Sequence, residues 1–580
     1  MRTIKYIVLL FLIFPLILSA QGFDELTDSK PVDNRLWEKQ KDGISVSWGS
    51  TNVRYSKTNV PQIKVETRKT LKGWKGEKLN AVILAWNKSN DCSIEIITSD
   101  LKSSSGSVIS RENISIGIVR QVMTDEFIRD GKTSCGFRKD KTEWDSSLVA
   151  DIIDNEHKTV LRAKNTVSAW LSVRIPYNVS HGLYKGVIRL KTENQILEEL
   201  SLDVEVGKLQ LPCFKKWNFH LDLWQNPYSV ARFHDVEVWS ESHMNLLRSV
   251  MKPLAEAGQK VITTSIMHKP WNGQTYDYFE SMVTWIRKID GSWDFSYDIF
   301  DKWVSFMHQL GIDKQINCYS MVPWNFSFRY FDERTNDMAI LKAKPGEQSY
   351  NEMWSAFLID FAKHLKEKGW FDKTCIAMDE RPLEVMKTVI ELVHKADRDY
   401  KIALAGQYFP EIEEHIYDYC VSLDQVIPED VIERRKNKGF ITTYYTYCAD
   451  YRPNVFTFSD PAEAAWIPIY VAKLGFTGYL RWAYNSWGEN PLQDSRFRQW
   501  PAGDTYYVYP GFRSSIRFEK TIEGIQQYEK IEFLRNKYAL NRVILKRIQK
   551  EIDAFKIEDV LKDGNAAKVT ERMQSFLNQF

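Results

Sequence analysis

The pattern of apolar and polar residues changes near residue 207. From residue 21 to residue 207 the chain has short apolar or alternating runs separated by Gly, Asn, Asp and Ser, for example 81–86, 93–97 and 170–175. Short runs with a period of two predict strands with one solvent-facing side. We therefore expect an antiparallel β-sandwich over 21–207. We expect it to pack or to act as a spacer, with carbohydrate binding as the alternative, because no aromatic platform stands out in it.

After the linker-like segment 207–212 the order of elements becomes strand, loop, helix. A helix is predicted over Ser242–Ala257, with Ser240 or Ser242 as N-cap and Gly258 as the stop. Four apolar side chains share one face of this helix: Met244, Leu247, Met251 and Leu254. Further helix-like segments cover 350–368, 383–396 and 462–474.

Strand-like apolar runs alternate with these helices. They cover 218–223, 261–267, 315–320, 374–378, 401–405, 420–423, 440–445 and 478–482. This alternation predicts a (β/α)8 TIM-like barrel over 213–515, with an open doubly wound sheet as the alternative. The segment 328–347 is expected to be an irregular loop over one face of the barrel.

The C-terminal segment, 516–580, carries apolar residues at helical spacing. These residues form two stripes: Ile522, Ile525, Tyr528, Ile531 and Leu534, then Ile544, Ile548, Ile552 and Phe555. We expect C-terminal helices that pack on the barrel. A coiled-coil surface is the alternative, but the heptad pattern is not sustained.

The length of the chain indicates two domains, and its N-terminal sequence indicates a secreted protein. A chain of 580 residues exceeds what one core usually serves. Its 78 Lys and Arg against 76 Asp and Glu form no long charged block, so we expect no nucleic-acid partner and no acidic membrane partner. Arg2 and Lys5, an apolar run from Tyr6 to Leu18, and Ser19-Ala20 predict a signal peptide over 1–20 and a periplasmic or secreted location. The run is too short for a membrane span.

The seven cysteines are too few and too irregularly spaced for a disulfide framework. A bridge between Cys92 and Cys135 is compatible with the sequence. We expect no metal site and no cofactor, because there is no CxxC or HExxH motif, the ten histidines do not cluster, and no Gly-rich phosphate loop is present.

Asp379 and Glu380 follow the apolar run 374–378 directly. The same dipeptide also occurs at 125–126 and 332–333, so the pair alone indicates little. In a barrel of this type, however, catalytic groups lie at the carboxyl ends of the strands. Residues with sugar-binding chemistry follow other strands: Trp224, Gln225, Asn226, His268, Trp271, Trp324, Asn325, Tyr445, Tyr447, Trp482, Asn485, Trp487 and, close by, Asp494 and Asp504. Aromatic faces stack on sugar rings while amides and carboxylates bind hydroxyls, so a carbohydrate site is predicted, although each Trp is equally compatible with core packing.

The adjacency of the two acids restricts the mechanism. A retaining glycosidase ordinarily places its two carboxyl groups about 5 Å apart across the scissile bond, and inverting enzymes place them further apart. Successive residues suit a substrate that supplies its own nucleophile, a 2-acetamido group. One acid then protonates the leaving oxygen, and the other stabilises the cyclised intermediate.

The chain resembles glycoside hydrolase family 123, the β-N-acetylgalactosaminidases. The resemblance rests on segments 221–227, 257–260, 319–324, 378–380 and 481–487 and spans nearly the whole mature chain. It implies a β-sandwich followed by a catalytic (β/α)8 barrel, and retaining, substrate-assisted hydrolysis. It also implies Glu380 as general acid/base and Asp379 as the residue that orients the acetamido group. The substrate contacts named above, among which Tyr445 or Tyr447 could donate to the acetamido oxygen, come from the strand-end argument alone.

Two other functions stay open at this point. A β-N-acetylglucosaminidase would use the same chemistry, since its sugar differs only at the C4 hydroxyl. A non-catalytic carbohydrate-binding surface protein could retain the barrel, but the intact acid pair argues against it.

Overall fold

The structure is a computed structural model that describes residues 24–28, 32–125, 146–193, 195–498 and 500–580. The predicted signal peptide, residues 1–20, and Cys135 lie outside these ranges. Within them, no helix is long and apolar enough to cross a membrane.

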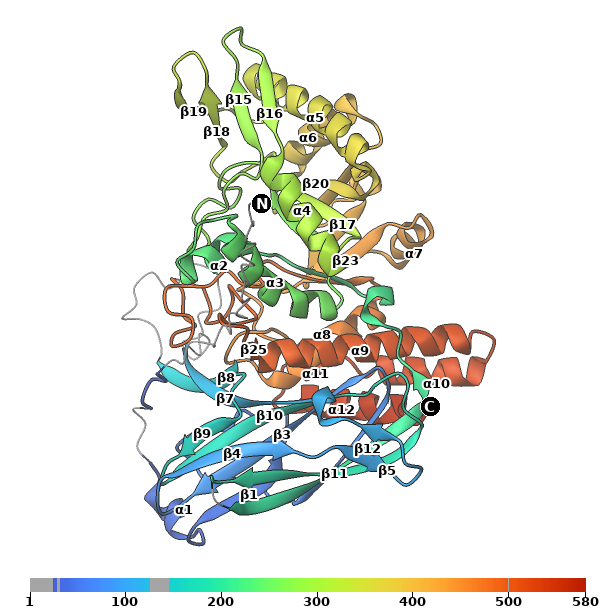
Figure 1. Cartoon of the computed structure of the whole chain (residues 1–580). Helices are drawn as coiled ribbons and strands as arrows, with labels where there is room; N and C mark the ends of the chain where they lie inside the picture. The colour runs from blue at the N-terminus through green and yellow to red at the C-terminus, as the bar shows by residue number, and fades with distance from the viewer. Residues whose placement is uncertain (1–23, 29–31, 126–145, 194, 499) are drawn as a thin grey trace, which may run out of the picture.

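The N-terminal part is a sandwich of two β-sheets around one apolar core (Figure 1). One sheet contains β1 (Ile44–Gly49), β3 (Lys78–Asn87), β10 (Asn165–Arg174), β7 (Ile114–Thr124), β8 (Ser147–Ile153) and β25 (Ser514–Ser515). The other contains β2 (Arg68–Lys75), β12 (Ile196–Gln210), β11 (Gly182–Lys191), β4 (Cys92–Thr98), β9 (Lys158–Leu161), β5 (Leu101–Ser103) and β6 (Val108–Ile109). The strand pairs are antiparallel apart from β2 with β12. The predicted β-sandwich is confirmed, and a strand from the far end of the chain, β25, completes one sheet.

The following part is a nearly closed barrel of eight parallel strands. Their order is β13 (His220–Leu223), β24 (Gly478–Arg481), β23 (Ile441–Tyr445), β22 (Asp418–Ser422), β21 (Lys401–Gly406), β20 (Thr374–Asp379), β17 (Gln315–Tyr319) and β14 (Val261–Ser265). Each strand falls within two residues of a predicted run. The barrel is therefore confirmed and the open doubly wound sheet is excluded.

Glutamine side chains close the barrel where β13 meets β14. Backbone pairing across this seam is limited to a bridge between Leu221 and Gln259. The buried Gln259 amide accepts from Leu223 N–H (3.0 Å) and donates to the carbonyls of Leu223 (3.2 Å) and Val261 (2.8 Å). Gln225 adds a second link by accepting from Thr263 N–H at 2.9 Å. Side-chain amides thus replace the missing peptide pairs, which would otherwise leave buried polar groups unsatisfied.

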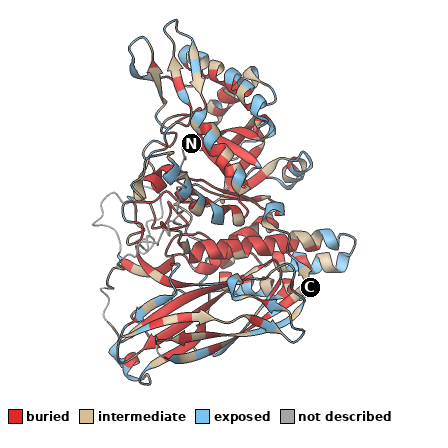
Figure 2. Ribbon diagram, viewed as in Figure 1, coloured by how far each residue is buried: buried red, intermediate tan, exposed pale blue. Residues whose placement is uncertain are grey.

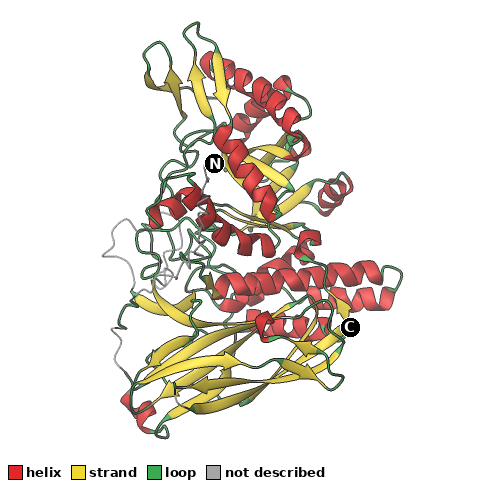
Figure 3. Ribbon diagram, viewed as in Figure 1, coloured by secondary structure: helices red, strands yellow, loops and turns green. Residues whose placement is uncertain are grey.

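Helices cover the outside of the barrel (Figure 3). They are α2 (Pro227–Phe233), α3 (Glu241–Glu256), α4 (Asp298–Leu310), α5 (Gln348–Lys368), α6 (Leu383–Ala396), α7 (Glu429–Asn437) and α8 (Pro461–Leu474). The helix predicted from residue 242 is α3. Its N-cap is Ser240, whose hydroxyl accepts from His243 N–H at 3.2 Å.

The segment 328–347 is not an irregular loop, and that expectation was wrong. It forms most of the hairpin of β18 (Ser327–Asp332) and β19 (Asp337–Lys342). With β15 (Thr284–Arg287) and β16 (Trp293–Ser296) this hairpin makes a four-stranded sheet that projects from the barrel (Figure 1). The residue that anchors this hairpin is Phe328, which is fully buried and packs edge-on against Tyr350 and Trp354 of α5.

The long helix α9 (Ile516–Lys537) lies between the barrel and the sandwich (Figure 2). Its predicted apolar stripe is buried, as expected, but polar positions on the helix are buried too. Lys530 pairs with Glu77 of the sandwich at 2.5 Å, and Glu529 accepts the backbone N–H groups of Asn218 and Phe219, which precede β13, at 2.7 Å each. Helices α10 (Arg542–Ile552), α11 (Ile557–Val560) and α12 (Asn565–Leu577) follow. Hence α9 joins the two parts of the molecule instead of packing on the barrel alone.

The bridge between Cys92 and Cys135 that the sequence allows is not formed, because Cys92 is a free thiol. Cys448, in the loop after β23, is disulfide-bonded. Cys375 and Cys420 are buried free thiols of the barrel interior. Cys318 is a buried free thiol on the other face of its strand, in the core shared with the helices.

Candidate active site

The acid pair lies at the carboxyl end of β20, at the mouth of the barrel. Asp379 is the last residue of the strand and is 7% exposed, whereas Glu380 is exposed. The interior below them is lined by small side chains, among them Cys375, Ala377, Ala403, Ala405 and Cys420.

The backbone conformation at Glu380 makes the two carboxyl groups point in different directions. Glu380 has a left-handed φ of +41°, and its N–H donates to Ala405 O at 2.6 Å. A non-glycine residue in this region is strained and persists only where its surroundings impose it. Gly406 makes the arrangement feasible, because a Cβ there would lie 3.1 Å from the Cα and N of Glu380. The turn takes Glu380 out of the strand while Asp379 stays in the barrel interior.

Asp379 is held by two donors. The Trp324 indole N–H donates to its Oδ2 at 3.3 Å, and Arg381 Nη2 lies 3.5 Å from its Oδ1. Burial raises the pKa of Asp379 to about 6, an effect that Arg381 opposes and that the nearby Glu380 carboxylate reinforces. Asp379 is therefore a carboxyl group whose charge depends on one buried arginine.

Arg381 links Asp379 to Trp324. It is 8% exposed, and its Nε donates to Val322 O at 3.0 Å. Its guanidinium lies 4.2 Å from the centroid of the Trp324 ring, a cation–π contact. Sequence reasoning missed Arg381, although it directly follows the acid pair.

Glu380 faces an open cavity of about 560 Å³. Tyr445, at the end of β23, donates its hydroxyl to Glu380 Oε1 at 3.0 Å, and the Tyr447 ring lies 6.0 Å from the Tyr445 ring. The cavity is lined by Glu380, Arg381, Pro382, Gln407, Phe409, Ser422, Gln425, Tyr445 and Tyr447. Its size is that of a small-molecule site. Gln407, Phe409 and Gln425 were missed, although Gln407 directly follows β21 and could have been found by the strand-end rule.

Trp224 and Trp271 belong to a buried aromatic cluster. Trp224 lies 4.8 Å from Trp271 and 4.6 Å from Tyr319 between ring centroids, and both tryptophans are 4% exposed. Phe279 packs on the edge of Trp271 at 4.7 Å. The cluster fills the side of the barrel next to β13, β14 and β17.

Four predicted substrate contacts are enclosed by protein. Asn226 and Asn485 exchange hydrogen bonds, Asn226 N–H to Asn485 Oδ1 at 2.9 Å and Asn485 Nδ2 to Asn226 O at 2.7 Å. Trp487 is fully buried and donates to Val508 O at 2.7 Å. Asp504 is 1% exposed, pairs with the Arg481 guanidinium at 2.5 Å and accepts from the Trp482 indole at 3.2 Å. These four side chains fix the loops, and of the residues after β24 only the half-buried Trp482 stays near the mouth.

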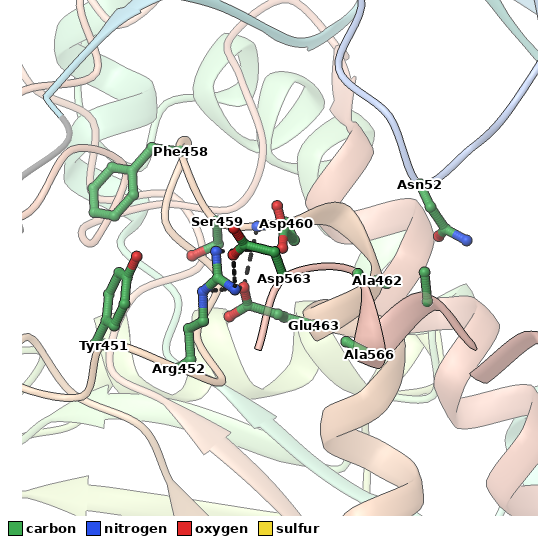
Figure 4. A pocket seen from close by; sticks show the side chains of 12 residues that line it. Asn52, Tyr451, Arg452, Phe458, Ser459, Asp460, Ala462, Glu463, Asp563 and Ala566 are labelled. Atoms are coloured by element: carbon green, nitrogen blue, oxygen red, sulfur yellow. Dashed lines mark hydrogen bonds and ion pairs between the residues drawn. The ribbon is translucent and has the colours of Figure 1, made fainter. Parts of the chain in front are cut away.

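A second cavity, of about 440 Å³, lies between a sandwich loop, the start of α8 and the start of α12 (Figure 4). Arg452 is surrounded there by Asp460, Glu463 and Asp563, with closest approaches of 3.4, 3.4 and 2.7 Å. Burial raises the pKa of Glu463 to about 8. Arg452 links the loop after β23 to the C-terminal helices, and its charge is already offset by these acids.

Among the residues that the structure describes, no group of three or more His, Cys, Asp or Glu could hold a metal ion.

An acid pair at the strand ends of a (β/α)8 barrel, next to aromatic and amide side chains, is typical of glycoside hydrolases. The comparisons with known proteins agree. The family model of the glycoside hydrolase 123 catalytic domain matches residues 224–534, and that of the glycoside hydrolase 123 N-terminal domain matches residues 48–192. The chain belongs to glycoside hydrolase family 123, and its substrate is a carbohydrate.

A solved structure gives the same result. A family 123 glycoside hydrolase from Clostridium perfringens, studied for glycolipid glycan hydrolysis, is 28% identical with a TM-score of 0.81, over 93% of this chain and 98% of that one. A family 39 glycoside hydrolase from Bacteroides cellulosilyticus WH2 is much less similar, 11% identical with a TM-score of 0.32, over 72% and 79% of the two chains. No curated protein gave a significant match.

Proposed function

We propose that this glycoside hydrolase releases β-linked N-acetylgalactosamine from glycan ends by retaining, substrate-assisted catalysis. The observation that carries the proposal is the contrast between two adjacent acids. Asp379 is buried between Trp324 and Arg381, whereas Glu380 faces the open cavity. Two acids on one strand end approach a sugar from the same side, which suits a nucleophile supplied by the substrate.

In the proposed first step, the Asp379 carboxylate accepts the acetamido N–H and orients the acetamido oxygen towards C1. Glu380 gives its proton to the glycosidic oxygen as the bond from C1 to that oxygen breaks. The acetamido oxygen forms the new bond to C1, and the positive charge of the cyclic intermediate lies next to Asp379. The leaving alcohol departs with the proton from Glu380.

In the second step, the Glu380 carboxylate takes a proton from water as the water oxygen attacks C1. The bond from C1 to the acetamido oxygen breaks, the acetamido group is restored, and Glu380 is again protonated. Two displacements at C1 give net retention. Tyr445, which donates to Glu380 Oε1 at 3.0 Å, holds that carboxylate in position at this stage.

The test is hydrolysis of an aryl β-N-acetylgalactosaminide by the wild type, Glu380→Gln and Asp379→Asn. We expect each variant to lose more than roughly 10²-fold in kcat/KM, because general acid catalysis and charge stabilisation each contribute about that much. Near wild-type rates in both variants would refute the proposal. Lys568→Met, a change on the exposed side of α12, serves as the surface control.

The same assay with the gluco epimer measures the choice at C4, and the family resemblance favours the galacto sugar. An aryl 2-deoxy-2-trifluoroacetamido substrate tests acetamido participation. Its weaker carbonyl nucleophile is expected to lower kcat, whereas an enzyme nucleophile would leave kcat little changed. We also propose export through the sequence 1–20, which cell fractionation would test.

A further inference from the structure

An exposed aromatic surface lies beside the acid pair, on the loop that follows β14. Tyr276 and Tyr278 of this loop are 38% and 44% exposed. Trp324, whose indole reaches Asp379, is 40% exposed. Exposed large aromatic side chains near a carbohydrate site supply stacking faces for sugar rings.

Hydrogen bonds hold this loop next to the acid pair. Trp324 N–H donates to Pro270 O at 3.3 Å, so the start of the loop is fixed to the residue that contacts Asp379. The neighbouring Lys269 N–H donates to Phe279 O at 2.9 Å, which brings the two ends of the loop together. The loop is therefore part of the wall of the site.

The opposite side of the loop is fixed to the segment after β24. The Trp500 indole donates to Gln274 O at 3.2 Å, and its ring packs edge-on against Trp482 at 6.0 Å. The Arg498 guanidinium donates to Gly273 O. Consequently the wall runs from Trp324 to Trp482 along one side of the barrel mouth.

Two cations in this wall have no carboxylate within ion-pair distance among the described residues. Lys269 Nζ lies over the Tyr278 ring, 3.6 Å from its centroid, and the exposed Arg498 has the carbonyl of Gly273 as its side-chain hydrogen-bond acceptor. We call Lys269, Tyr276, Tyr278 and Arg498 the cationic rim. The positive charges of Lys269 and Arg498 are available to a ligand that comes from solvent.

The loop's own acids do not neutralise these cations, because other groups hold them. Asp277 pairs with Arg232 at 2.8 Å. Glu280 accepts from His268 at 2.6 Å and lies 3.8 Å from Arg329. Glu280 interacts electrostatically with Lys269 and lowers the net charge there without forming an ion pair with it.

We propose that the cationic rim is a leaving-group subsite for a sugar that carries a carboxylate or sulfate group. The proposal rests on the proposed function, since an enzyme that removes a terminal sugar keeps that sugar at the acid pair and meets every further sugar on the leaving-group side. Tyr278 would stack on the ring of the second sugar. Lys269 and Arg498 would bind its anionic group by charge-assisted hydrogen bonds.

The test compares three oligosaccharides that end in β-N-acetylgalactosamine and whose second sugar is neutral, a uronic acid or a sulfate ester. We expect the wild type to prefer an anionic substrate by roughly 10-fold in kcat/KM, since two partly exposed charge contacts supply about that much. The double variant with Lys269→Met and Arg498→Met is expected to lose this preference, and 0.5 M salt to weaken it in the wild type. Lys568→Met, the surface control, is expected to retain it.

The uronate and sulfate arms distinguish the two kinds of anion. The proposal is refuted if the wild type treats neutral and anionic substrates alike, or if the double variant loses activity on both equally. Calorimetric binding of the same three oligosaccharides to Glu380→Gln protein separates the subsite from the reaction. If aryl β-N-acetylgalactosaminide is not cleaved, the proposed function fails, while tighter binding of the anionic oligosaccharides still supports the subsite and equal binding overturns it.

Discussion

Replacing Arg381 by Met is the sharpest test of how the acid pair is charged. In the proposed mechanism Asp379 must be ionised to stabilise the cyclic intermediate, so activity is expected to fall as the pH drops through its pKa of about 6. Two other titratable groups face it: Glu380, which raises that pKa, and Tyr319, whose own pKa is raised mainly by burial and, to a smaller extent, by Asp222 and Asp379. Arg381, 3.5 Å from Asp379 Oδ1, is the cation that lowers it.

The size of the effect follows from this contact. A hydrogen bond to a charged group contributes about 1.5–3 kcal/mol, and 1.36 kcal/mol corresponds to one pKa unit. In Arg381→Met we therefore expect the acid limb of the pH profile, where activity falls with falling pH, to move up by about one to two pH units. At pH 6 the ionised fraction of Asp379 would fall from about half to about 1–10%, roughly a 5- to 50-fold loss in kcat/KM. Well above pH 8 this part of the loss is expected to disappear.

The assay is a pH profile of kcat/KM on aryl β-N-acetylgalactosaminide for the wild type, Arg381→Met and Arg381→Lys. The lysine variant keeps the charge but not the planar group that stacks on Trp324, so its acid limb is expected to lie between the other two. Arg248→Met, on the exposed side of α3, controls for the loss of a positive charge. A loss of activity in Arg381→Met that is the same at every pH would refute the electrostatic account.

Three further predictions concern packing and stability. Gly406→Ala places a Cβ 3.1 Å from the backbone of Glu380 and so displaces that residue. We expect kcat to fall roughly 10- to 100-fold with less change in KM. The matched control is Gly488→Ala, whose Cβ would meet its nearest neighbour at 3.7 Å. Gln259→Leu removes the barrel-closing hydrogen bonds and is expected to lower Tm by about 5–10 °C in calorimetry; an unchanged Tm would show that the seam does not depend on them. Because the folded-state pKa of Glu463 is raised to about 8, its stabilising effect is present at low pH and is lost as the pH rises towards 8. The Tm of Glu463→Gln relative to the wild type is therefore expected to rise between pH 5 and pH 8.5, and a constant difference would contradict the raised pKa.

The sequence by itself determined the two-part fold and the place of the acid pair. The change from short alternating runs to alternating strands and helices is a local pattern, and local patterns set the type of each element. Because strand ends in a (β/α)8 barrel form the active face, the position of Asp379 and Glu380 after 374–378 was sufficient to place them at the mouth. The segment 328–347 was misassigned, because its hairpin is stabilised by Phe328 packing on the following helix α5, a tertiary contact that a local pattern does not show.

Only the tertiary structure decided which strand-end residues face a ligand. Asn485, Trp487 and Asp504 have the same residue types as a sugar site, yet each is enclosed by partners far away in the sequence or in another loop. Sequence spacing cannot show whether an indole or an amide finds such a partner, because this depends on how loops from different strands pack. The same packing brings Arg381 against Trp324 and gives the adjacent Asp379 and Glu380 different surroundings, one buried and one open.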